Sequence, residues 1–230
     1  GLNSVVLGGT LAGNYNVVLD GSEVIEITQR PISVIGDAGA FDKVYDGTIA
    51  VDTSRLSLNG LVAGDDVSFS GAYADKNVGS KSISFSMSGD DSPNYSFAQA
   101  VYTGNISQRT LELEYLISGN LVYDSSNPNL ELRSNPYISK PYDGTTAILG
   151  SSASSGSSSY TGLRIKSGTL CGSDIVYIEF ENSYYSGSAI GVYEGSNLVI
   201  TIGGHDSANS ALPEGLRGEI KSFNRTISMN

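Results

Sequence analysis

Residues Ser82-Ile-Ser-Phe-Ser-Met-Ser88 alternate without interruption between serine and an apolar residue. Successive side chains of an extended strand point to opposite faces, so Ile83, Phe85 and Met87 share one face and the serines share the other. Such a strand packs one face on a core and leaves the other in water, as strands of antiparallel sheets do. This stretch therefore predicts a half-buried β-strand.

The same period of two recurs in shorter runs, at 67–70, 111–115, 178–181 and 198–202. Gly, Asn, Asp and Pro separate the runs, and no helical face of eleven residues or more interrupts them. The sequence therefore predicts an all-β fold of two consecutive antiparallel β-sandwich domains, immunoglobulin-like in type. β-grasp-like repeats are the alternative, and they would require a helix across the sheet.

Several short motifs occur twice, in the same order along the chain. They are Lys-x-Tyr-Asp-Gly-Thr at 43–48 and 140–145, Gly-Asp-Asp-Val at 64–67 with Gly-Ser-Asp-Ile at 172–175, and Ile-x-Gln-Arg at 27–30 and 106–109. Self-similarity of this kind is typical of repeated domains.

The repeats predict two domains, at 1–110 and 111–230, which divide near the second Ile-x-Gln-Arg motif. Residues 1–30 resemble the last strands of a preceding copy and are assigned to the first domain. The second domain carries insertions, at 115–139 and in the serine-rich loop at 151–160. A serine-rich loop cannot bury apolar area, so we expect it to be exposed.

The repeated Tyr-Asp-Gly-Thr sequence predicts a structural corner in each copy. Glycine after aspartate tolerates a positive φ, and the carboxylate can accept the N–H two residues further on. A recurring binding aspartate is the alternative, but a motif kept in each copy more often builds the repeat. The corner residues are Tyr45, Asp46, Gly47 and Thr48 in the first copy and Tyr142, Asp143, Gly144 and Thr145 in the second.

A second tyrosine follows asparagine at the start of an apolar run, as Tyr15 and as Tyr95. Its position resembles the tyrosine corner of immunoglobulin-like sandwiches, in which the hydroxyl ties a loop to a strand. The last copy reads Asn209-Ser-Ala-Leu212 and has no tyrosine there. We expect the rings of Tyr45, Tyr95 and Tyr142 to be buried and structural.

This order of motifs, together with Asp-Lys-Asn-Val-Gly-Ser at 75–80, resembles the YDG/MBG-type repeats. Those repeats occur in tandem in large secreted bacterial surface proteins and adhesins. The resemblance extends over 31–110 and the tail copy at 1–30, and it is partial over 111–230. It implies an extracellular β-rich module without catalytic residues, whose partners are adjacent repeats of the same chain.

Composition excludes several other classes. The 13 basic and 24 acidic side chains give a net charge of −11, which provides no field to attract the phosphates of a nucleic acid. No stretch approaches the ~18 apolar residues of a membrane-spanning helix, so we expect no membrane insertion. One cysteine and one histidine, Cys171 and His205, cannot form a zinc cluster.

The residues do not predict an enzyme. His205 lies in a glycine-rich turn, and no nucleophile motif accompanies it. Glu179 and Glu181 could form a glycosidase pair, but the wet face of an amphipathic strand explains them more simply. We expect no cofactor. A structural calcium is the open alternative, at Asp37, Asp65, Asp66, Asp90 and Asp91.

These observations predict a non-catalytic stalk or spacer within a bacterial cell-surface adhesin. The alternative is a ligand-binding module for a host glycan or matrix protein, carried by the insertions of the second domain, because binding residues favour loops on a rigid scaffold. Exposed tyrosines at a sugar-stacking platform would serve that alternative, although the chain has no tryptophan. The candidates for that platform are Tyr160, Tyr184, Tyr185 and Tyr193.

Overall fold

The computed structural model describes residues 14, 26–99, 101–117, 120–124, 138–148 and 162–222. Tyr15, Tyr160, residues 125–137 of the expected insertion and the serine-rich loop lie outside these ranges. The described part of the chain is all-β, and its only helical elements are 3-10 turns of three residues. The helix that β-grasp repeats require is not among the described residues, and no described helix is long and apolar enough to cross a membrane.

The first group of strands forms two sheets around one hydrophobic cluster. The larger sheet has the order β2-β7-β5-β4 and the smaller one the order β3-β1-β6. The cluster between them includes Tyr45, Tyr73 and Ile83. We call this group the first unit. Its strands are β1 (Arg30–Gly36), β2 (Lys43–Val44), β3 (Leu56–Asn59), β4 (Ser68–Tyr73), β5 (Gly79–Ser88), β6 (Tyr95–Phe97) and β7 (Tyr102–Ser107).

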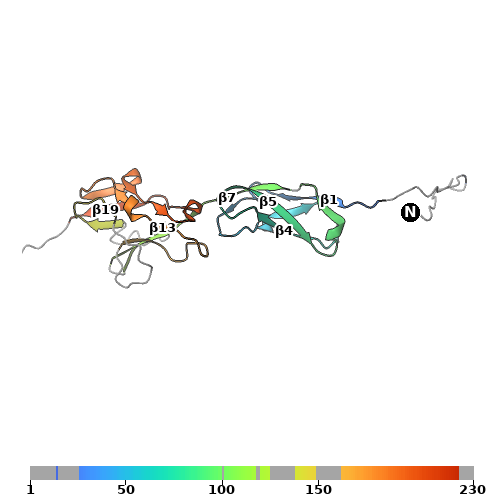
Figure 1. Ribbon diagram of the computed structural model, residues 1–230, viewed down its shortest axis with the longest axis horizontal. Helices are drawn as coiled ribbons and strands as arrows, with labels where there is room; N and C mark the ends of the chain where they lie inside the picture. The colour runs from blue at the N-terminus through green and yellow to red at the C-terminus, as the bar shows by residue number, and fades with distance from the viewer. Residues whose placement is uncertain are drawn as a thin grey trace, which may run out of the picture.

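The second group, which we call the second unit, surrounds a separate cluster that includes Leu113, Tyr185 and Ile220. Its sheets have the orders β10-β9-β12 and β11-β19-β15, and three pairs of short strands complete it: β13-β17, β14-β16 and β18-β8. Figure 1 shows the two units one after the other along the long axis of the molecule.

The first seven strands of the second unit are β8 (Arg109–Thr110), β9 (Leu113–Ile117), β10 (Asn120–Asp124), β11 (Ile138–Pro141), β12 (Gly162–Ile165), β13 (Tyr177–Ile178) and β14 (Tyr184–Tyr185). The remaining ones are β15 (Gly191–Glu194), β16 (Leu198–Val199), β17 (Ile202–Gly203), β18 (Ser210–Ala211) and β19 (Arg217–Lys221). The 3-10 turns are η2 (Thr53–Arg55), η3 (Ser92–Asn94), η4 (Phe180–Asn182), η5 (Gly195–Asn197) and η6 (Ser207–Asn209).

The two units repeat the same strand pairings. In the first, β2 runs parallel to β7 with Lys43 opposite Ile106, and β5 is antiparallel to β7. In the second, β11 runs parallel to β19 with Lys140 opposite Ile220, and β15 is antiparallel to β19. The repeat of sequence motifs is therefore also a repeat of sheet topology, so residues of the two units can be compared position by position.

The strand predicted at 82–88 is confirmed as part of β5. Its apolar side chains lie on the inner face, and Ile83 is fully buried while the serines that alternate with it are exposed. Ser70 and Ser86 face each other on the outer surface and share a hydrogen bond of 3.0 Å between their hydroxyls.

Two expectations about carboxylates are wrong. The predicted strand at 178–181 ends at Ile178, and Phe180–Asn182 form a 3-10 turn in which Glu179 accepts a hydrogen bond from Asn182, so Glu179 and Glu181 do not share a strand face. Glu114, expected in water, is buried because β12 pairs with β9 and brings the Arg164 guanidinium to 2.5 Å from its carboxylate.

Candidate functional site

A lysine organises the repeated corner of the first unit. The Lys43 ammonium donates to the Asp46 carboxylate at 2.8 Å and to the carbonyl oxygens of Thr48 and Ala50 at 2.8 and 3.1 Å. The same Asp46 oxygen accepts the Thr48 N–H at 2.8 Å, and Gly47 takes a φ of 78°. The corner is thus a closed loop in which one cation satisfies the carbonyls that the bend leaves unpaired.

The second unit contains the same arrangement. Lys140 donates to Asp143 at 2.7 Å and to the carbonyl oxygens of Thr145 and Ala147 at 2.9 and 3.0 Å. Gly144 also has a φ of 78°. We call both arrangements lysine corners. The turn expected from Asp-Gly-Thr is confirmed in each copy, but the lysine was missed; its signal was a lysine three residues before the aspartate in both.

The second lysine corner predicts a dependence of stability on acid. The hydrogen bond from Lys140 lowers the pKa of Asp143 from 3.8 to about 2. In the unfolded chain the carboxylate returns to its ordinary value and binds a proton more readily, so the folded state loses stability as the pH falls from about 4 towards 2. Above pH 4 this contribution is fully present.

Unfolding in urea at several pH values between 2 and 5 measures this effect. We expect Asp143→Asn to make the stability profile less steep in that window, because one of the carboxylates that titrate there has been removed. Parallel profiles for the variant and the parent would contradict the assignment.

The three tyrosines expected to be buried behave differently. Tyr45 and Tyr95 are only 1% and 3% exposed, which confirms the prediction for them. Tyr142 is 47% exposed, so the prediction is wrong for the second copy. The reason is that the second unit covers the end of the first unit at Tyr45, as the contacts below show. Tyr142 lies at the corresponding end of the second unit.

Tyr95 ties a loop to its strand. Its hydroxyl accepts the Val62 N–H at 3.1 Å and donates to the Asp65 carboxylate at 2.5 Å. The hydrogen bond to Asp65 raises the pKa of Tyr95. The loop that the hydroxyl holds precedes Tyr95 by about one hairpin, further upstream than the tyrosine corner of immunoglobulin domains would place it.

Ionic contacts join the two units. Asp174 of the second unit accepts from the Tyr45 hydroxyl at 2.9 Å and from the Lys76 ammonium at 3.1 Å. The ammonium of Lys76 also lies 3.6 Å from the Asp206 carboxylate. The neighbouring Tyr45 hydroxyl and Asp174 carboxylate raise the pKa of Lys76, so the cation stays charged. The Asp174 side chain itself is almost completely buried.

Amide groups extend this contact. The Val78 N–H donates to the Asn209 side-chain oxygen at 2.9 Å, and the Asn209 amide donates to Asn77 at 3.1 Å. Cys171 is half-buried and lies at this contact beside Tyr45. We call the whole contact, defined by Tyr45, Lys76–Val78, Cys171, Asp174, Asp206 and Asn209, the junction.

The segment between the units is also fixed to the second unit. Gln108 donates through its side chain to the Ala208 carbonyl at 3.1 Å, and Arg109 donates to the Thr169 carbonyl at 2.9 Å. The first copy of the motif makes the same kind of contact, because Gln29 donates to the carbonyl of Pro93 and Arg30 to that of Gly60. The Gln-Arg pair therefore fixes the chain as it enters each unit.

The contacts at the junction explain why the last copy has no tyrosine at the position of Tyr95. Ser210 pairs with Arg109 as Tyr95 pairs with Arg30, so serine stands in the tyrosine position. Asp65 and Asp174 occupy matching turns, which shows that the motifs expected to align at 64 and 172 are shifted by one residue. The Tyr95 hydroxyl donates a hydrogen bond to Asp65 within its own unit, whereas the Asp174 carboxylate of the second unit accepts one from the Tyr45 hydroxyl of the first.

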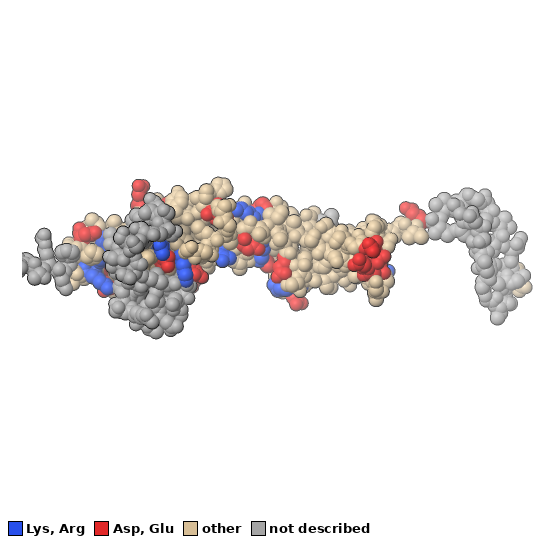
Figure 2. Space-filling view, turned by 90° about the horizontal axis from the view of Figure 1, so that it is seen from below, with Lys and Arg blue, Asp and Glu red and all other residues tan. Residues whose placement is uncertain are grey.

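The remaining candidate residues do not assemble into a catalytic or metal site. Within the described ranges, no group of three or more His, Cys, Asp or Glu side chains could hold a metal ion. Asp66 and Asp91 bind backbone N–H groups of the turns around them, and Figure 2 shows acidic side chains gathered at the end of the first unit remote from the second. His205 is exposed, with its Nδ1 atom 3.4 Å from Asp206.

The described tyrosines of the proposed sugar platform lie in different environments. Tyr185 is buried, and its hydroxyl donates to the Ile138 carbonyl at 2.6 Å. Tyr193 packs edge-on against Tyr185 and donates to the Ala189 carbonyl, while Tyr184 is exposed. These three rings do not form a common exposed surface.

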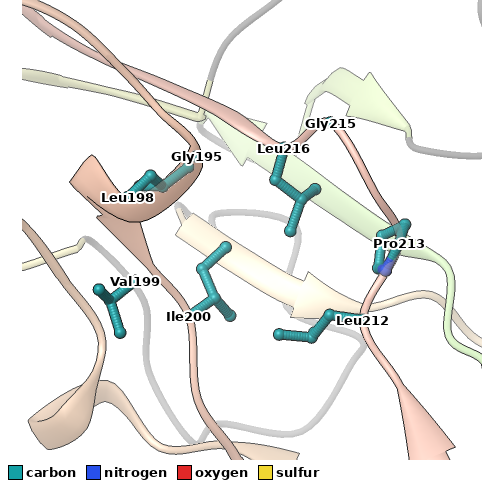
Figure 3. Close-up of a pocket in the computed structure, with 8 residues that line it drawn as sticks. All are labelled: Gly195, Leu198, Val199, Ile200, Leu212, Pro213, Gly215 and Leu216. Atoms are coloured by element: carbon teal, nitrogen blue, oxygen red, sulfur yellow. The ribbon is translucent and has the colours of Figure 1, made fainter.

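The second unit contains an apolar pocket of about 380 Å³ that sequence reasoning missed. Leu198, Ile200, Leu212 and Leu216 point into it (Figure 3). At the positions of the last three, the first unit has aromatic residues that pack against one another, namely Phe85, Phe97 and Tyr102. Smaller aliphatic side chains therefore leave space where the first unit is filled.

Comparison with known families agrees with the first unit. Residues 28–104 match the model of the YDG domain. No curated protein matches the chain, and no solved structure matches it. A YDG domain is therefore present at 28–104, and the strand pairings and lysine corner of this domain recur in the second unit.

Proposed function

We propose that this chain is a non-catalytic extracellular module that acts as a stalk or spacer in a bacterial cell-surface adhesin. In this proposal the chain forms two consecutive immunoglobulin-like sandwich domains, at 1–110 and 111–230, and their partners are adjacent repeats. The observation that carries the proposal is the junction, in which one unit is held end to end on the next.

The junction suits a spacer for a physical reason. A repeat unit folds around its own core, so adding units adds length without a larger core. Length is useful only if neighbouring units do not fold back on each other. The contacts of Asp174 with Tyr45 and Lys76, and the contact of Asn209 with Val78, all restrict that motion.

Small-angle scattering of the full chain tests the proposal. We expect the profile of an elongated rod with two lobes. Asp174→Ala should cost the junction roughly 1–3 kcal/mol, because the hydroxyl of Tyr45 and the ammonium of Lys76 lose their acceptor. The variant should give a broader distribution of distances between the lobes and an unchanged circular dichroism spectrum.

Lys81→Gln is the matched control, because Lys81 pairs with Asp75 inside the first unit and not across the junction. Its scattering should equal that of the parent. A compact globule for the parent would contradict the spacer. Antibodies against the chain should also label intact cells that express the parent protein, and this labelling should disappear after surface proteolysis.

The pocket of the second unit favours a second candidate function, the binding of a glycan or host matrix protein. Its test is an array of such ligands with the full chain and with the double variant Ile200→Phe/Leu212→Phe. This variant introduces the aromatic residues of the first unit and fills the pocket. Saturable binding that the double variant loses would favour this function over a pure spacer.

A further inference from the structure

The end of the second unit that corresponds to the junction carries two exposed apolar side chains. Tyr142 is 47% exposed and Ile190 is 59% exposed. We call these two residues the terminal face. Their counterparts in the first unit are Tyr45, which is 1% exposed, and Val78, which packs against the first hydrophobic cluster.

The correspondence follows from backbone hydrogen bonds and strand register. The Tyr45 N–H donates to the Ser107 carbonyl at 2.9 Å, and the Tyr142 N–H donates to the Lys221 carbonyl at 2.8 Å. Val78 and Ile190 each precede a glycine that lies opposite the matching isoleucine of β7 or β19. The backbone is therefore the same at both ends. The difference in exposure follows from the second unit, which covers the first.

The sequence beyond β19 continues this pattern. Residues 224–227 read Asn-Arg-Thr-Ile, close to the Gln-Arg-Thr-Leu of 108–111 with which the second unit begins. Arg109 of that earlier segment fixes the entry of the chain into the second unit. The same kind of segment thus follows both units.

We infer that the terminal face is a docking surface for a further repeat unit of this kind, whose aspartate at the position of Asp174 receives the hydroxyl of Tyr142. This inference rests on the proposed function and names the partner of the terminal face. A large exposed tyrosine at the same end of the sheet as an exposed isoleucine is suited to such an end contact, since the ring buries apolar area and the hydroxyl keeps a polar partner.

The contact differs from the junction in one respect. Ser188 stands where Lys76 stands in the first unit, so no ammonium faces the incoming carboxylates from this position. Screening by salt weakens exposed ion pairs and leaves hydrogen bonds and apolar contacts much less affected. Docking at the terminal face should therefore depend less on ionic strength than the junction does.

A tandem chain tests this inference. Residues 1–221 are followed directly by a second copy of 108–230, because Lys221 occupies the position of Ser107. The probe is Tyr142→Trp, the sole tryptophan in the chain, whose indole N–H can still donate to an aspartate. We expect acrylamide to quench this tryptophan several-fold less in the tandem than in the single chain.

Ile190→Asp in the tandem is the matched control and should restore quenching, because Ile190 is exposed in the single chain and its replacement leaves the core untouched. Equal quenching in the tandem and in the single chain, with the added copy folded by circular dichroism, would overturn the inference.

A second variant tests the inference without the added copy, in case that copy fails to fold. Lys76→Ser/Asn77→Ala/Val78→Ile gives the first unit the residues that stand at 188–190. The inference expects the full chain to keep the scattering profile of the parent. A profile as flexible as that of Asp174→Ala would show that these residues cannot support docking, and it would leave the spacer proposal itself intact.

Discussion

Replacing Lys140 with methionine is expected to lower the free energy of unfolding of the second unit by about 2–4 kcal/mol. The lysine is 2% exposed and donates to a carboxylate and to two carbonyl oxygens. Methionine fills a similar volume but donates no hydrogen bond, so these acceptors lose their partner. The effect is smaller than for a fully buried pair because Asp143 is accessible to water.

Urea unfolding followed by circular dichroism measures this loss. Lys43→Met is the matched variant in the first unit, where the lysine side chain is more exposed, at 11%. We expect a smaller loss there. If Lys140→Met unfolds at the urea concentration of the parent, the lysine corner does not stabilise the fold as argued.

Tyr95→Ala is expected to cost about 3–5 kcal/mol, the usual effect of removing a buried aromatic side chain. The ring is 3% exposed, and the hydroxyl connects the loop at Val62 and Asp65 to β6. Tyr95→Phe keeps the ring and loses these hydrogen bonds, so its cost should be only about 1–2 kcal/mol.

Thermal and urea unfolding of both variants separate the contribution of the ring to the free energy of unfolding from that of the hydroxyl. Tyr142→Ala is the control, because Tyr142 occupies an exposed position and its removal should change the stability little. A melting temperature of Tyr95→Ala equal to that of the parent would show that the loop is not held by this tyrosine.

Local features of both units could be predicted from short stretches of sequence. The alternation over 82–88 is sufficient to predict β5, because successive side chains of a strand point to opposite faces. The Asp-Gly-Thr turn is likewise predictable, since Asp46 and Asp143 bond an N–H just two residues away. The lysine of each corner was predictable in principle, because it too lies within eight residues of all its acceptors.

Other features depend on which surfaces meet, and no local pattern contains that information. Phe180 is predicted to lie in a strand and lies in a turn, because β13 ends at Ile178, opposite the first residue of its short partner β17. Glu114 is predicted to be exposed to solvent but is buried, because β12 pairs with β9 and places Arg164, 50 residues further along the chain, against its carboxylate. The pocket arises where Ile200, Leu212 and Leu216, from different strands and loops of the second unit, meet in the folded structure.

The all-β class and the turn within each lysine corner could therefore be predicted from the sequence, because these depend on residues within a few positions of one another. The burial of Tyr45, the exposure of Tyr142 and the hydrogen bond from the neighbouring unit to Asp174 depend instead on contacts that form only in the folded chain. The two tyrosines stand in the same motif, so their difference lies in whether another unit packs against them. That packing joins residues as far apart in sequence as Tyr45 and Asp174, and its energy is a property of the assembled surfaces.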